Sequence, residues 1–146
     1  MKKYILLFLL AVSITATAQP RRGKFDPKRF EIEMQQFIIT EAGLTPKEAA
    51  AFFPLFDEMQ KKQRVLFDKM RNYRFVDTSD NKASLKAIRE MDEIDLEIKK
   101  LQRDYHIKFC KVLPPGKVLK VIRADDKFHR DAFTRMMRHQ PQGQKR

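Results

Sequence analysis

The stretch from Leu44 to Met70, LTPKEAAAFFPLFDEMQKKQRVLFDKM, constrains the fold more than any other part of this chain. Thr45 is suited to cap a helix, Pro46 suits the first helical position, and Glu48 follows three residues after the cap, which together predict a capping box. Apolar residues then recur at helical spacing, and because their phase continues across Pro54 we expect a kink there and not an end. The expected buried face comprises Phe52, Phe56, Met59, Leu66, Phe67 and Met70.

The first residues have the pattern of a secretory signal peptide. Two lysines precede an apolar run from Tyr4 to Val12, and Ala16-Thr17-Ala18 forms an A-x-A cleavage site. The apolar run is too short to remain as a membrane-spanning helix. We therefore expect residues 1–18 to be removed after Ala18, leaving a soluble protein exported to the periplasm.

The chain is strongly basic, with a formal charge of +12 that becomes +10 without the two signal-peptide lysines. Such a charge ordinarily suggests nucleic acid, but export argues against that partner. Acidic surfaces of other exported proteins, anionic lipid and envelope polymers are the expected partners, and salt should weaken the attraction. Cys110 is the only cysteine, so no internal disulfide can form.

Composition predicts an all-α fold of four helices, because helix-forming residues dominate and no run alternates as a strand does. A helix should begin at Asp26-Pro27 and stop at Gly43, a residue suited to the left-handed conformation after a helix. Another should occupy residues 81–112, which contain neither glycine nor proline and would span roughly 45–50 Å. Leu113-Pro114-Pro115-Gly116 should end it and start a fourth helix.

Four segments follow from this division. Residues 1–18 are the signal peptide, 19–25 a flexible basic arm, 26–138 the helical domain and 139–146 a disordered tail. The two long helices should fold into an antiparallel hairpin that the outer two helices cover. Besides the face already named, the residues expected to be buried are Phe30, Met34, Phe37 and Ile38; Ile88, Met91, Ile98, Leu101, Tyr105 and Val112; and Val118, Val121, Ile122, Phe128, Ala132, Phe133 and Met136.

Two short segments resemble the paired LTxxQ motifs of the Spy/CpxP family of periplasmic proteins. Residues 44–48, LTPKE, are similar to the first copy, and residues 113–117, LPPGK, to the second. The matching motif residues are Leu44, Thr45, Glu48, Leu113, Pro114 and Lys117, of which Glu48, Pro114 and Lys117 depart from the family pattern. The resemblance implies a kinked helical hairpin, a cradle-like homodimer and ATP-independent chaperone activity or envelope-stress sensing.

A second apolar face on the third helix carries the client-binding hypothesis. Leu96, Ile107 and Cys110 project opposite Ile98 and Tyr105, so something outside the helix pair must cover them. A partner subunit or a client would do so, and we favour a dimer interface. Basic residues nearby would steer acidic unfolded chains towards this face, unless they are simply solvated. The candidate client-binding residues are Lys61, Lys62, Arg64, Lys69, Arg71, Leu96, Lys100, Arg103 and Ile107.

A metal site has weaker support. His106 and Cys110 are four residues apart and share a side of the helix, as two ligands would, but a good site needs four. Asp125 and His129 have the same spacing, and there the carboxylate should satisfy a half-buried imidazole. No metal site is assigned on this basis.

Nothing in the chain indicates an enzyme, because phosphate-binding loops, nucleophile motifs and distinctive carboxylate pairs are absent. No cofactor is expected. The favoured function is an ATP-independent periplasmic chaperone for unfolded or misfolded envelope proteins. The alternatives are a periplasmic metal- or stress-sensing regulatory protein, with a membrane signalling protein as its partner, and a structural envelope protein.

Overall fold

The computed structural model describes residues 26–138, and every regular element in that range is helical. The helices are α1 (Pro27–Ala42), α2 (Pro46–Arg71), the short 3-10 helix η1 (Asn72–Phe75), α3 (Asn81–Val112) and α4 (Pro115–Arg138). The predicted all-α fold of four helices is confirmed. The predicted signal peptide, basic arm and tail lie outside the described residues. Within the described range, no helix is both long and apolar enough to cross a membrane.

Local capping explains where the helices begin and end. The Asp26 carboxylate accepts hydrogen bonds from the backbone N–H groups of Lys28 and Arg29, at 3.0 and 3.3 Å. Asp80 caps α3 in the same way. Gly43 has φ of 61° after α1, a left-handed conformation that glycine adopts without strain. α2 continues through Pro54, as predicted.

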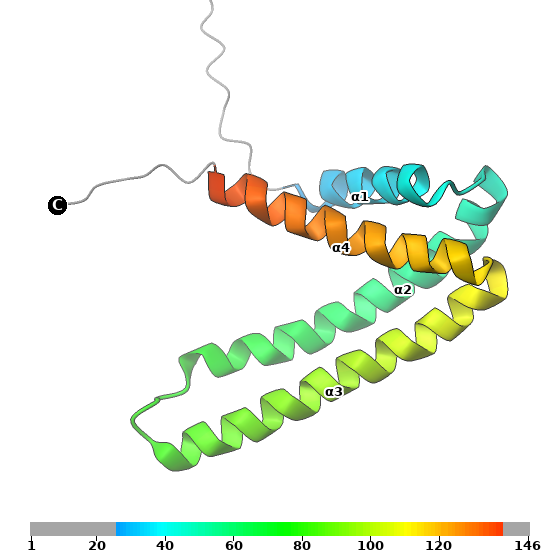
Figure 1. Ribbon diagram of the computed structural model, residues 1–146. Coiled ribbons are helices and arrows are strands. Elements are labelled where there is room, and N and C mark those ends of the chain that lie inside the picture. Colours follow the sequence, from blue (N-terminus) through cyan, green and yellow to red (C-terminus); the bar gives the residue numbers. More distant parts are fainter. Residues whose placement is uncertain (1–25, 139–146) are drawn as a thin grey trace, which may run out of the picture.

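The helices form two antiparallel pairs that meet at one end and diverge from there (Figure 1). α2 and α3 pack along each other as the hairpin arm, and α1 packs along α4 as the short arm. Two turns lie at the meeting point, one between α1 and α2 and the other between α3 and α4. The expectation that the outer helices cover the whole hairpin is therefore wrong, since α1 and α4 pack mainly against each other.

A single hydrophobic core holds the arms together where they meet. Its rings pack edge to face, with the centroids of Phe52 and Phe109 4.9 Å apart and those of Phe30 and Phe128 5.1 Å apart. We call this set the junction core; its buried members are Met34, Ile38, Ala42, Leu44, Phe52, Phe56, Met59, Tyr105, Phe109, Leu113, Val118, Val121, Ala124 and Phe128.

Beyond the junction core, several residues of the predicted buried faces are exposed. In the distal hairpin, which we define as residues 64–98, Phe67 is 50% exposed and Ile88 56% exposed, and Met91 is also exposed. Phe133 and Met136 are exposed at the end of α4. The predictions of burial were wrong for Phe67, Ile88 and Met91 because α2 and α3 cover each other along one line only. They were wrong for Phe133 and Met136 because these residues lie beyond Phe128, the last buried residue of α4.

Candidate functional site

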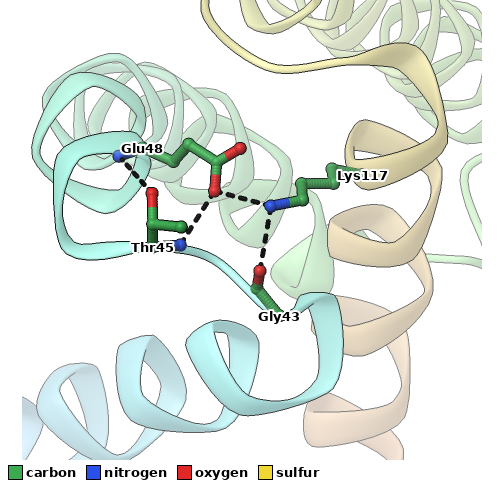
Figure 2. A network of polar contacts seen from close by, with 4 residues as sticks. All are labelled: Gly43, Thr45, Glu48 and Lys117. Carbon is green, nitrogen blue, oxygen red and sulfur yellow. Dashed lines mark hydrogen bonds and ion pairs between the residues drawn. The ribbon is translucent and has the colours of Figure 1, made fainter.

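The two motif segments, far apart in sequence, lie against each other where the arms meet. Lys117 reaches from the first turn of α4 and donates hydrogen bonds to Glu48 Oε2 at 2.6 Å and to the Gly43 carbonyl at 3.0 Å (Figure 2). The same Glu48 carboxylate accepts the Thr45 backbone N–H at 2.8 Å, which completes the predicted capping box. Two of the residues that depart from the LTxxQ pattern, Glu48 and Lys117, therefore pair with each other.

Electrostatics at this contact favour the charged carboxylate. The hydrogen bond from Lys117, followed by that from the Thr45 backbone, lowers the pKa of Glu48 from 4.5 to about 2. Leu44 and Leu113 lie buried in the junction core. Each motif thus contributes an apolar anchor, and a polar bridge between Glu48 and Lys117 holds α2 and α4 together.

The outer face of α3 presents the predicted second apolar face to solvent. Leu96 is 51% exposed and Ile107 56% exposed. Lys100 and Arg103 lie between them in sequence at spacings of three and four, so they share that face. A shallow groove beside it is lined by Arg103, His106, Ile107 and Cys110, and a second, on the α2 side, by Lys62, Val65 and Lys100.

The candidate basic residues differ in whether another side chain already pairs with them. Lys62 donates to Glu58 and to the Tyr105 hydroxyl, both at 2.8 Å, and the bond to Glu58 raises the pKa of Lys62. Arg71 pairs with Asp68, and Arg103 with Asp104 at 3.1 Å. Among residues 26–138, the remaining candidates form no salt bridge. They are Lys61, Arg64, Lys69 and Lys100.

Sequence patterns did not predict the cleft of about 600 Å³ that lies between the two arms. Its apolar lining includes Phe56, Phe109 and Val121 of the junction core, and the side chain of Gln63 is buried beside them. α2 and α3 contribute the cations Arg64 and Lys99, whereas α4 contributes Asp125 and Asp126. Residues from three helices line this cleft, so the periodicity of apolar residues within any one helix could not predict it.

The candidate metal ligands lie in the groove beside the outer face of α3. Cys110 is exposed, and burial together with the charge of Lys99 lowers the pKa of the half-buried His106. Within residues 26–138, no group of three or more His, Cys, Asp and Glu side chains is arranged to hold a metal. His129 lies 3.3 Å from Asp125, and this contact raises the pKa of His129.

Comparison with known proteins assigns neither a family nor a function to this chain. No family model, no curated protein and no solved structure matches this chain. The Spy/CpxP resemblance therefore rests on the sequence of the two motif segments and stays a prediction.

Proposed function

We propose that this protein is an exported, ATP-independent chaperone that holds unfolded or misfolded proteins in the periplasm. The proposal extends to a homodimer of the Spy/CpxP kind, without nucleic acid, cofactor or enzymatic activity. The observation that carries it is the outer face of α3, where Leu96 and Ile107 are half exposed beside Lys100 and Arg103.

Such a face suits a client that has no fixed structure. Isolated apolar side chains on a convex helix contact any exposed hydrophobic segment, but each buries little area and so holds it loosely. The cations attract acidic chains over a longer distance and speed their encounter. Of these, Lys100 makes no salt bridge among the described residues, so its charge is available to a client.

The test is light scattering from an aggregating, chemically denatured client with and without the processed chain, at low and high salt and without nucleotide. Near-stoichiometric suppression supports a chaperone, and its loss at high salt assigns capture to the basic residues. The variant Leu96→Ser/Ile107→Ser should suppress aggregation less well than the wild type. A matched control, Phe133→Ser/Met137→Ser, changes similarly exposed residues on α4 and should suppress normally.

Sedimentation velocity of the same variants distinguishes a subunit interface from a client-binding surface on the outer face of α3. If Leu96→Ser/Ile107→Ser converts a dimer into a monomer, the face belongs to the subunit interface. If the variant stays dimeric and loses suppression, the face contacts the client. Absence of suppression by the wild type in both buffers would contradict the chaperone proposal.

A further inference from the structure

The second half of α4 presents a face that nothing else in the described structure covers. Phe128 is the last buried residue of this helix, and it packs against Phe30 of α1. Beyond it, Phe133 is 60% exposed, Met136 61% and Met137 53%. In Figure 1 the red end of α4 extends past the beginning of α1, which agrees with this exposure.

Basic residues flank these apolar side chains. Arg123, Arg130, Phe133 and Met137 follow one another at spacings of seven, three and four, which places them on one side of the helix. α4 carries seven basic and three acidic residues, and Asp126 lies on this same side. Among residues 26–138, neither Arg123 nor Arg130 forms a salt bridge.

We propose that this face of α4, from Arg123 to Met137, docks flat onto an anionic lipid surface. A helix with aromatic and methionine side chains on one face, bordered by arginines, suits the boundary between headgroups and acyl chains. The apolar side chains enter that boundary while the arginine stems reach back to the phosphates. Near an anionic surface, each added cation strengthens binding about fivefold.

The charge of the face favours anionic lipid as its occupant. Arg123 and Arg130 lie on the same side of α4 as Phe133 and Met137, so cations and apolar side chains would meet the membrane together. No described helix crosses a membrane, so attachment would be peripheral and salt-sensitive. The proposal is independent of the chaperone function, because it uses α4 and leaves the outer face of α3 free.

The test is co-sedimentation of the processed chain with vesicles of phosphatidylcholine alone and of phosphatidylcholine mixed with phosphatidylglycerol in equal parts. We expect binding to the mixed vesicles only, weakened by salt. Phe133→Ser/Met137→Ser should bind at least about tenfold more weakly. Its matched control, Phe67→Ser/Ile88→Ser, changes similarly exposed apolar residues of the distal hairpin and should bind like the wild type.

A second pair of variants tests whether the charge acts locally. Arg123→Gln/Arg130→Gln should weaken binding by more than tenfold, from about fivefold per residue. Lys61→Gln/Lys69→Gln lowers net charge equally on α2 and should change binding little. Equal losses in these two variants would show that overall charge attracts the vesicle, which overturns the proposal.

Two further results would overturn it. One is the absence of binding to the mixed vesicles. The other is a fall in oligomeric mass of Phe133→Ser/Met137→Ser on sedimentation, because that would show a second copy covering this face. Either outcome leaves the aggregation assay unaffected, so the two proposals fail separately.

Discussion

The junction core and the distal hairpin have the same kind of sequence pattern, but large apolar residues of that pattern are buried in the first and partly exposed in the second. Phe52 and Phe56 lie in α2 at a spacing of four and are fully buried. Phe67 continues the predicted apolar face of the same helix, yet half of it is exposed. The difference is that α1, α3 and α4 all contribute residues to the core around the first part of α2, whereas α3 is the helix that packs along its second part.

This contrast shows that apolar periodicity predicts which side chains of a helix can be buried. How many neighbouring helices cover that face decides which of these side chains are buried. A two-helix layer shields one narrow line of side chains on each partner, and the flanks of each apolar face stay in water. The outer face of α3 and the exposed face of α4 are where we propose that this protein interacts with its surroundings.

The largest expected effect on stability comes from comparing two phenylalanines on α2. Phe52→Ala should lower the free energy of unfolding by about 3–5 kcal/mol, since it leaves a cavity in the junction core. Phe67→Ala should lower it by about 1 kcal/mol or less, because that ring is half exposed. Urea unfolding followed by circular dichroism measures both values.

Equal losses in the two variants would contradict the contrast. They would mean that Phe67 is covered in solution, and a dependence of the midpoint on protein concentration would then identify a second copy as the cover.

A smaller difference in the free energy of unfolding is expected within α3, where buried Ile98 is compared with exposed Ile88. Ile98 is buried but lies outside the junction core, so Ile98→Ala should cost about 2 kcal/mol, at the low end for buried isoleucine. Ile88→Ala should change the free energy of unfolding by about 0.5 kcal/mol or less. Amide hydrogen exchange provides an independent check, since the hairpin tip should exchange before the junction core in the wild type.

The smallest effect concerns the bridge between Glu48 and Lys117. The pKa of Glu48 falls from 4.5 to about 2 on folding, so the carboxylate contributes stability above pH 4.5 that is lost as the pH drops towards 2. Glu48→Gln removes this titration but keeps a side chain able to complete the capping box. Its melting temperature should therefore fall less than that of the wild type across this pH range.

The control for this measurement is Glu33→Gln, which removes a carboxylate of an exposed pair with Arg29 on α1. That variant should follow the wild-type decline closely. If Glu48→Gln declines as steeply as the wild type, the bridge contributes nothing to holding α2 and α4 together.

Local rules predicted the helices well and the site poorly. The limits of α3 at Asn81 and Val112 and the left-handed Gly43 follow from side chains next to them in sequence, so no tertiary information was needed. Glu48 and Lys117 were each noticed as departures from a motif, but their pairing depends on how the two arms meet. The cleft between the arms gave no sequence signal at all.

Sequence by itself determined four helices, their caps and the faces that can be buried, because hydrogen bonding and side-chain direction in a helix are set by residues a turn away. Tertiary structure alone decided which parts of those faces are covered. Burial requires a second surface brought from elsewhere in the chain, and beyond the junction core that surface covers only a narrow line of side chains such as Ile94 and Ile98. Phe67, Ile88 and Phe133 remain in water for that reason.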